Sequence, residues 1–251
     1  MGGVPAVRTT EIRYSSRHSA ELVDLPMPDL DADPVFTAMF AQARPHTMTH
    51  KETLFALYQA AQHVAGRGIP GDFVECGVWK GGSALMAGLA LRHFDPARMR
   101  RRLWLYDTFT GMTAPTAADV DMLGVAAQDY LDRYADDGLW CYAAQDGVGG
   151  MLRAHGFGAD DTRLVAGDVL QTLRHTAPDA IAILRLDTDW YESTLAELQV
   201  LYPRLATGGV LIVDDYGHWA GARRAVDEYF ADKPVPLLNR VNYSVRMAIK
   251  A

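Results

Sequence analysis

IAILRLDTDW, at residues 181–190, is the stretch that decides the fold of this 251-residue chain. It begins as a short apolar run and stops at the carboxylates of Asp187 and Asp189. This pattern is typical of a buried parallel strand that carries acidic groups at its C-terminal end, where open α/β sheets bind ligands. A second run, at 210–213, stops in the same way at Asp214-Asp215. The segment between the two runs is long enough for one helical crossover, so the two strands should be close neighbours.

Up to four carboxylates converge if these two strands pair, because their tips then lie about 5 Å apart. At an effective dielectric constant of about 20, each pair of like charges about 4 Å apart costs on the order of 4 kcal/mol. Such a cluster holds either protons or a cation. Oxygen ligands with no nearby group of Cys or His favour a hard divalent ion, with Mg²⁺ first and Mn²⁺ or Ca²⁺ as alternatives.

Strand and helix signals alternate regularly from residue 72 onwards, which predicts an α/β fold with a doubly wound, mostly parallel seven-stranded sheet. The expected parallel strands are 72–76, 103–106, 163–165, 181–186 and 210–213. Between and after them we expect helices at 83–93, around 130, at 151–155, at 192–205 and at 222–230. Two strand-like runs, Val235 to Leu238 and Tyr243 to Ile249, predict a C-terminal antiparallel hairpin.

The first part of the chain differs from the rest. Residues 1 to about 33 are polar and rich in proline near their end, with no clear period, so we expect an arm or partial lid over residues 1–48 and one domain over 49–251. Thr49 and Glu52 have the spacing of a capping box ahead of a helical apolar pattern. Glycine and proline at 66–70 should end that helix.

The composition favours a small molecule as the partner. With 31 acidic and 24 basic residues the net charge is -7, and no stripe of Lys or Arg offsets it, which argues against nucleic acid. The two cysteines, Cys76 and Cys141, lie far apart in no metal-type spacing, as expected in a reducing cytoplasm. No run approaches membrane-spanning length, so we expect no membrane partner.

A glycine-containing loop, ECGVWKGGS at residues 75–83, follows the first expected strand and opens a helix. Glycines allow a close approach of the backbone to a ligand, and the free N–H groups at the start of a helix attract an anion. The position is that of a nucleoside-cofactor loop. The spacing departs from G-x-G-x-x-G, which needs a glycine where Trp79 stands, and from the P-loop, which ends in GK[ST] rather than Gly81-Gly82-Ser83.

Two further carboxylates follow neighbouring strands of the expected sheet. Asp107 ends the second strand, where an acidic residue can accept hydrogen bonds from a ribose diol. Asp168 ends the third strand and could meet an adenine amino group. A helix N-cap is the alternative role for both, and for Asp168 the two roles are equally well supported.

Four segments together resemble the TylF/macrocin O-methyltransferase family: ECGVWKGGS, LYDTFTGM, LRLDTDWYEST and VDDYGHWAGARRAVDEYF. The resemblance covers roughly residues 45–250. It implies a Rossmann-like class I methyltransferase fold and an enzyme that depends on S-adenosylmethionine and Mg²⁺ and methylates hydroxyl groups of natural products, such as those of sugars. It also suggests a homodimer or larger homo-oligomer.

The resemblance also assigns roles, position by position. It implies that Glu75, Gly77 and Ser83 line the methionine part of the cofactor, and a lid segment at Thr47 to Thr49 folds over it, with Thr49 in contact. The other implied cofactor contacts are Asp107 at the ribose, Asp168 near the adenine, Thr108 and Asp187. The implied metal ligands are Asp187, Asp214 and Asp215, and the implied general base is Asp189.

The chemistry of methyl transfer to an alcohol is consistent with this set. The sulfonium methyl is already activated, so the enzyme has to position and deprotonate the acceptor. A bound Mg²⁺ lowers the pKa of a hydroxyl that it contacts, and Asp189 can then receive the proton. In an extended strand Asp187 and Asp189 point to the same face, so one can bind the ion while the other faces the acceptor. The alternative is that Asp189 only caps the helix that follows.

Aromatic side chains flank the acidic cluster and could form apolar walls for a glycoside, although packing is their alternative role. They are Trp190, Tyr191, Tyr216 and Trp219. His218 could act as a second base or bind the acceptor, and a solvated loop histidine is equally consistent with the sequence.

Two other classes of function stay open at this point. Asp187-Thr188-Asp189 also fits the D-x-D motif of a nucleotide-sugar glycosyltransferase, although such motifs usually lie earlier in a chain and lack this upstream glycine loop. A non-catalytic small-molecule binder of the same fold is the third possibility, because fold alone does not determine function.

Overall fold

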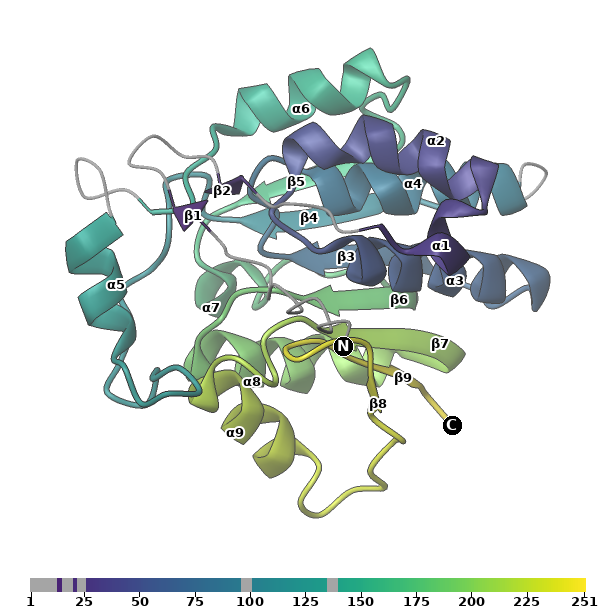
Figure 1. Cartoon of the computed structure of the whole chain (residues 1–251). Coiled ribbons are helices and arrows are strands. Elements are labelled where there is room, and N and C mark those ends of the chain that lie inside the picture. Colours follow the sequence, from purple (N-terminus) through teal and green to yellow (C-terminus); the bar gives the residue numbers. More distant parts are fainter. Residues whose placement is uncertain (1–12, 15–19, 22–25, 96–100, 135–139) are drawn as a thin grey trace, which may run out of the picture.

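The structure, a computed structural model, describes residues 13–14, 20–21, 26–95, 101–134 and 140–251 (Figure 1). A seven-stranded sheet with the order β5-β4-β3-β6-β7-β9-β8 forms its centre. The strands are β3 (Asp72–Cys76), β4 (Leu103–Asp107), β5 (Thr162–Ala166), β6 (Ile181–Leu186), β7 (Leu205–Val213), β8 (Asn239–Arg240) and β9 (Arg246–Ile249). The first five are parallel, and β9 and β8 add antiparallel pairs at the edge beyond β7. The predicted doubly wound, mostly parallel sheet is therefore confirmed.

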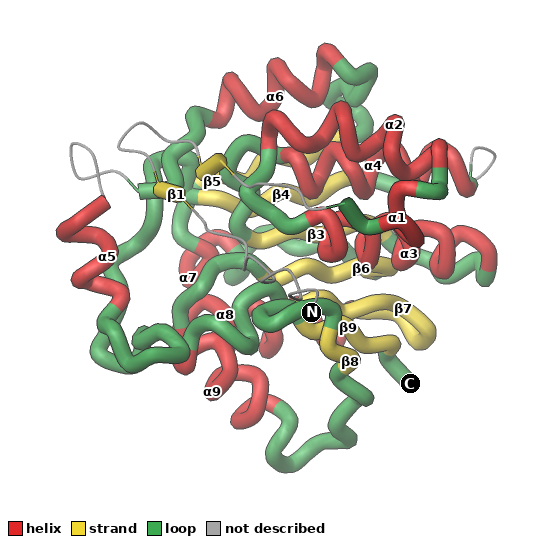
Figure 2. Tube along the Cα trace, in the orientation of Figure 1, coloured by secondary structure: helices red, strands yellow, loops and turns green. Residues whose placement is uncertain are grey.

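Helices cover both faces of the sheet (Figure 2). In chain order they are α1 (Pro28–Asp31), α2 (Pro34–Ala43), η1 (Arg44–His46), α3 (Lys51–Gly66), α4 (Gly82–Phe94), α5 (Ala127–Tyr134), α6 (Gln145–Ala154), α7 (Val169–Thr172), α8 (Tyr191–Leu201), η2 (Tyr202–Arg204) and α9 (Ala220–Tyr229). A two-stranded pair of β1 (Arg13–Tyr14) and β2 (Ala20–Glu21) precedes them.

Two hydrophobic layers hold the helices to the sheet. Alternate residues of one strand enter different layers, so that Ile183 belongs to the cluster that includes residues of α2, α3 and α4, whereas Leu184 belongs to the cluster that includes residues of α7, α8 and α9. Every residue of β6 is buried, which matches the continuous apolar run that predicted a central parallel strand. Burial on both faces fixes the register of β6 and hence the place where it ends.

The C-terminal hairpin is present, but its first strand is shorter and later than predicted. We expected a strand from Val235 to Leu238, and β8 contains only Asn239 and Arg240. Pro234 and Pro236 lack the N–H groups that a strand needs. The predicted helix at 192–205 also ends early, because η2 and the start of β7 occupy its last four positions.

The helix at α3 forms, but the capping box predicted for it does not. His50 is the N-cap residue of α3 and makes no side-chain capping bond. The Thr49 hydroxyl instead lies 3.2 Å from the Ser83 hydroxyl and accepts a hydrogen bond from Arg185 at 3.3 Å. Tertiary contacts at the sheet edge therefore replace the local cap.

The helices before residue 47 were not predicted. Two prolines of this region that were interpreted as loop signals, Pro28 and Pro34, stand at the first positions of α1 and α2. Asp33 caps α2, because its side chain accepts hydrogen bonds from the Val35 and Phe36 N–H groups at 2.9 and 3.0 Å. An N-cap aspartate followed by proline is a helix-start signal, so the sequence did contain an indication of α2.

Phe36→Ala should lower the free energy of unfolding by about 3–5 kcal/mol, because a fully buried ring is removed. The Phe36 ring packs against Phe55 and Tyr58, with centroid distances of 4.9 and 5.5 Å. Phe40→Ala, in the same helix but only partly buried, is the matched control and should cost less. Urea denaturation followed by circular dichroism measures both, and equal small losses would show that α2 is not part of the core.

Candidate active site

The acidic cluster forms where β6 and β7 end. The two strands pair in parallel with Leu186 opposite Val213, and the Asp214 N–H donates to the Leu186 carbonyl at 2.9 Å. The Asp187 N–H donates to the Cys76 carbonyl of β3 at the same distance. Asp187 and Asp214 therefore leave adjacent strands side by side, as the sequence predicted.

Asp187, Asp214 and Asp215 fit a divalent cation. One oxygen of each can be chosen so that the three lie within 4.8 Å of one another. Asp215 Oδ2 is buried and has no hydrogen-bond partner among the described residues. Burial, and then the charge of the neighbouring Asp189, raises the pKa of Asp215 well above its usual value. A buried carboxylate oxygen with no donor, next to two further carboxylates, is chemically suited to a hard cation.

Asp189 reaches the same cavity by a turn rather than by an extended strand. β6 ends at Leu186, and Asp189 has a φ of 68°. The Trp190 N–H donates to the Thr188 carbonyl at 2.8 Å and closes a three-residue turn around Asp189. The premise that the strand continues through Asp189 is therefore wrong, although Asp187 and Asp189 do line one cavity.

Asp189 also does not cap the helix that follows it, which was the alternative role considered for this residue. Trp190 is the N-cap residue of α8 and makes no side-chain capping bond. The N–H of Tyr191, the first residue of α8, donates to Asp119 at 2.8 Å. Burial, and then the charge of Asp187, raises the pKa of Asp189 to about 7.

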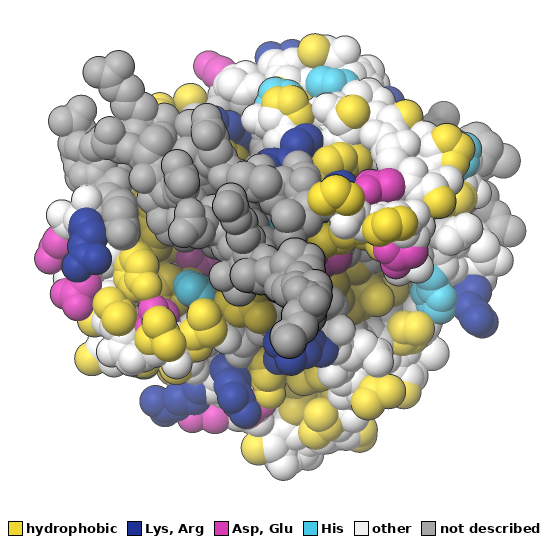
Figure 3. Space-filling model, in the orientation of Figure 1, with side chains coloured by type: hydrophobic (Ala, Val, Ile, Leu, Met, Phe, Trp, Pro, Cys, Tyr) yellow, Lys and Arg dark blue, Asp and Glu magenta, His cyan; other side chains and the backbone are white. Residues whose placement is uncertain are grey.

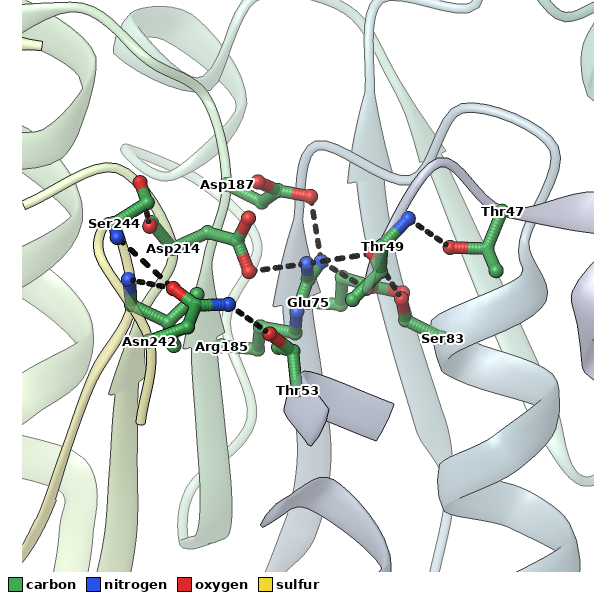
Figure 4. Close-up of polar contacts among 11 residues, drawn as sticks. Thr47, Thr49, Thr53, Glu75, Ser83, Arg185, Asp187, Asp214, Asn242 and Ser244 are labelled. Carbon is green, nitrogen blue, oxygen red and sulfur yellow. Dashed lines mark hydrogen bonds and ion pairs between the residues drawn. The ribbon is translucent and has the colours of Figure 1, made fainter. Parts of the chain in front are cut away.

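Arg185 is the central residue of the site, and the sequence analysis missed it. Its side chain is 1% exposed, and its guanidinium donates to Glu75 at 2.7 Å, to Asp187 at 2.6 Å and to Asp214 at 2.6 Å (Figure 4). A further contact reaches the Thr49 hydroxyl at 3.3 Å. The available signal was a charged residue inside a strand that is otherwise apolar, since a buried charge requires partners.

Glu75, expected beside the methionine part of a cofactor, lies fully buried behind the cluster. Its Oε1 accepts the hydrogen bond from Arg185. Burial raises the pKa of Glu75 to about 7, although the Arg185 charge opposes this shift. Its contact in this structure is therefore with Arg185, and Glu75 is not among the residues that line the two cavities described below.

A first cavity opens over the acidic cluster. Its polar lining includes Thr49, Ser83, Arg185, Asp187, Asp189, Asp214, Asp215 and Asn242, and its aromatic and histidine lining comprises His46, His50, Trp79, Tyr130, Trp140, His218, Trp219 and Tyr243. Apolar side chains lie beside acidic and histidine side chains on the lower left of the face in Figure 3. Tyr130, Trp140 and Trp219, which line the cavity, pack together with Trp190. Of the four aromatic residues expected as walls, Trp219 lines the cavity and Trp190 packs against Trp219. Tyr191 and Tyr216 are not among the lining residues, and their hydroxyls donate to Glu228 and Asp227.

His218 also lines the first cavity. Its ring packs against Trp219 and Tyr243, with centroid distances of 4.8 and 5.9 Å. Burial lowers the pKa of His218, which favours the neutral imidazole. A neutral ring in this position can accept a proton or a hydrogen bond from a bound molecule.

A second cavity lies on the other side of Asp187. Its lining includes Gly77, Asp107, Thr108, Asp168, Asp187, Thr188 and Ser193. Gly77 has a φ of 82°, and a Cβ there would overlap the Asp187 carbonyl at 1.9 Å, so only glycine fits. The glycine loop and the acidic strand tips are therefore in direct contact, and Asp187 lines both cavities.

The carboxylates of the second cavity have structural contacts as well. Asp107 accepts hydrogen bonds from the Val78 and Trp79 N–H groups of the glycine loop at 2.7 and 3.0 Å, and from Phe109 at 2.7 Å. Asp168 caps α7 through the Leu170 N–H at 2.8 Å. Thr108 donates its hydroxyl proton to the Gly111 carbonyl at 2.5 Å. Cap and cavity-lining roles thus coexist at Asp168.

Known proteins similar to this chain identify its family. The macrocin O-methyltransferase (TylF) family model matches residues 5–243. The chain belongs to this family. It is an S-adenosylmethionine-dependent O-methyltransferase, as the resemblance of its motifs predicted.

Curated relatives are natural-product enzymes. One is the 8-demethyl-8-(2,3-dimethoxy-alpha-L-rhamnosyl)-tetracenomycin-C 4'-O-methyltransferase of Streptomyces olivaceus, 34% identical over 79% of this chain and 73% of its own. Another is the demethyldecarbamoylnovobiocin O-methyltransferase of Streptomyces niveus, 33% identical over 75% of this chain and 69% of its own. Among solved structures, the O-methyltransferase NovP matches with a TM-score of 0.70 and 29% identity, over 82% of each chain. These matches agree with the class I methyltransferase fold of this family member.

None of the helices in the described part of the chain has the length and apolar character that crossing a membrane requires.

Arg185→Met should lower the free energy of unfolding by about 3–5 kcal/mol, because it leaves buried carboxylates without their cation. Arg224→Met is the matched control, since it breaks an exposed pair with Glu228 on α9 and should change stability little. Chemical denaturation at neutral pH measures both. Similar effects of the two substitutions would contradict a structural role of the Arg185 network.

Proposed function

We propose that this enzyme transfers the methyl group of S-adenosylmethionine to a hydroxyl of a sugar or glycoside, in an Mg²⁺-dependent reaction with Asp189 as the general base. The observation that carries this proposal is that Asp187 lines both cavities, with the glycine loop on one side and the carboxylate cluster on the other. A donor in the second cavity and an acceptor in the first cavity would then meet beside Asp187. Methyl transfer requires such a junction, because the two reacting atoms must approach in line.

The second cavity suits the donor. Asp107 and Asp168 would offer carboxylate oxygens to a ribose diol and an adenine amino group, and Gly77 lines the same cavity. Thr108 lines the same cavity. Thr49 and Ser83, whose hydroxyls lie 3.2 Å apart in the lining of the first cavity, would contact the methionine part of a donor that extends past Asp187.

The metal ligands would be Asp187, Asp214 and Asp215. When bound there, Mg²⁺ would supply Lewis-acid activation of the acceptor hydroxyl and a fixed point for its oxygen. Arg185 holds Asp187 and Asp214 each through one oxygen, and the other oxygen of each remains for a cation. The chain's own residues thus orient the ligand set before any ion is bound.

Asp189 would take the acceptor proton. The acceptor oxygen forms a bond to the methyl carbon while the bond from that carbon to sulfur breaks, and the hydroxyl proton moves to the Asp189 carboxylate. S-adenosylhomocysteine and the methyl ether are the products. His218, on the wall of the same cavity, is the second candidate for a proton acceptor or an acceptor contact.

The acceptor class follows from relatives and from the cavity wall. The relatives' names describe 4'-O-methylation of a rhamnosyl-bearing tetracenomycin and O-methylation of demethyldecarbamoylnovobiocin. Aromatic rings such as Trp219 and Tyr243 line the first cavity and can pack against a sugar face. Family membership argues against a D-x-D glycosyltransferase and against a non-catalytic binder. The homo-oligomeric state and cytoplasmic location expected from the sequence stay predictions.

Chelation should abolish turnover if the carboxylate cluster holds Mg²⁺. With a glycoside acceptor panel, we expect EDTA to stop formation of S-adenosylhomocysteine and excess Mg²⁺ to restore it. Asp214→Asn should weaken Mg²⁺ activation by at least about 10-fold, with calorimetric affinity for S-adenosylmethionine nearly unchanged. Full activity in EDTA would remove the metal from the mechanism.

Asp189→Asn should lower kcat by about 10²–10⁴-fold, because an amide cannot accept the acceptor proton. Affinity for S-adenosylmethionine should stay within about threefold, since the second cavity is unchanged. Asp232→Asn, an exposed aspartate after α9, is the matched control. If Asp189→Asn keeps wild-type kcat while His218→Ala loses it, the base is His218 instead.

A further inference from the structure

A fully buried glutamate lies behind the turn that carries Asp189. Glu197, on α8, is 0% exposed, and its Oε1 accepts a hydrogen bond from the Thr188 hydroxyl at 2.8 Å. Neither the metal cluster nor the donor cavity includes Glu197. Burial raises the pKa of Glu197 to about 8, so the group is mainly a neutral acid at pH 7. An acid in an apolar layer, where Leu198 and Leu201 are its helix neighbours, needs a reason other than core packing.

The turn itself is strained. Its central residue, Asp189, has a φ of 68°, and the hydrogen bond from the Trp190 N–H to the Thr188 carbonyl spans only three residues. This is the less common form of the γ-turn, which side-chain-bearing residues rarely adopt. Such a conformation persists only when surrounding contacts hold it.

The surrounding contacts act on both sides of Asp189. On the N-terminal side, the Thr188 hydroxyl lies 2.8 Å from Glu197 and 2.9 Å from the Ser193 hydroxyl. On the C-terminal side, the Trp190 indole donates to the Thr113 carbonyl at 3.0 Å. Ser193 and Glu197 are both side chains of α8, and Glu197 is the more deeply buried of the two.

We propose that Glu197 is a positioning residue for methyl transfer, which fixes the turn through Thr188 and thereby aims the Asp189 carboxylate into the first cavity. This inference rests on the proposed role of Asp189 as the base. Glu197 touches neither substrate nor cofactor in this account. Its effect should therefore appear in the chemical step and not in donor binding.

Two pairs of variants test the proposal, with kcat and KM measured for S-adenosylmethionine at saturating acceptor. Glu197→Leu and Thr188→Val break the hydrogen bond and should lower kcat by about 10–100-fold, because small displacements of a catalytic group cost this much. The KM for the donor should change by less than about threefold. Glu197→Gln keeps an acceptor oxygen and should recover most of kcat, as should Thr188→Ser relative to Thr188→Val. Glu192→Gln, on the exposed face of the same helix, is the control without effect.

Several results would overturn the proposal. Wild-type kcat in Glu197→Leu would do so, and so would an equal loss in Glu197→Gln. A raised donor KM with unchanged kcat would assign Glu197 to support of the second cavity, which Thr188 also lines. If Glu197→Leu does not fold, the Thr188 pair decides, because it leaves the core glutamate in place.

A double substitution separates this inference from the proposed function. If Glu197 acts through Asp189, Asp189→Asn with Glu197→Leu should have a kcat within about threefold of Asp189→Asn alone. If the kcat losses of the two single variants multiply in the double variant, the positioning role of Glu197 is overturned. Wild-type kcat in Asp189→Asn would overturn the proposed base itself, whereas a strong defect there with none in Glu197→Leu would overturn only the inference about Glu197.

Discussion

The buried guanidinium of Arg185 is the constraint on which the site depends. Removal of an arginine from water is costly, and the cost is offset only when good partners surround it. Here the partners come from three adjacent strands, with Glu75 on β3, Asp187 after β6 and Asp214 after β7. The network therefore joins the ends of these strands. It holds the carboxylates in fixed directions, which loose loop side chains could not achieve.

The same network explains how several acidic groups share a small space. Glu75, Asp187 and Asp214 bind the guanidinium, and burial together with neighbouring carboxylates raises the pKa of Glu75, Asp187 and Asp215. Such a cluster holds either protons or a divalent cation. Asp187 is part of this cluster and also borders the second cavity, because its backbone contacts the glycine loop at Gly77. One short segment after β6 thus joins the donor side to the acceptor side.

The parts of the site that could be predicted are those fixed by strand ends. Asp187, Asp214 and Asp215 follow apolar runs whose burial sets where each strand stops, so pairing of β6 with β7 was enough to bring them together. Arg185 was missed because its partners are far apart in the sequence and only the β3–β6 register brings Glu75 opposite it. The turn at Asp189 was not predicted because we extended the two-residue alternation of the strand as far as Asp189. The hydrogen bond from the Trp190 N–H to the Thr188 carbonyl forms a turn there instead. The capping box at Thr49 failed for a similar reason, since tertiary partners outcompeted the local one.

Gly77 and Asp189, which both lie close to Asp187, have positive φ angles, but one is a glycine and the other is not. At Gly77 the backbone must pass within contact of the Asp187 carbonyl, so a side chain is excluded and glycine removes the strain. At Asp189 a glycine would relieve a strain of order 1–3 kcal/mol, but it would also remove the carboxylate. The strained conformation is therefore kept where a side chain faces the cavity, and the hydrogen bonds of Thr188 and Trp190 supply the opposing stabilisation. The backbone strain of this site therefore lies at Asp189, because a glycine there would lack the carboxylate that the proposed chemistry needs.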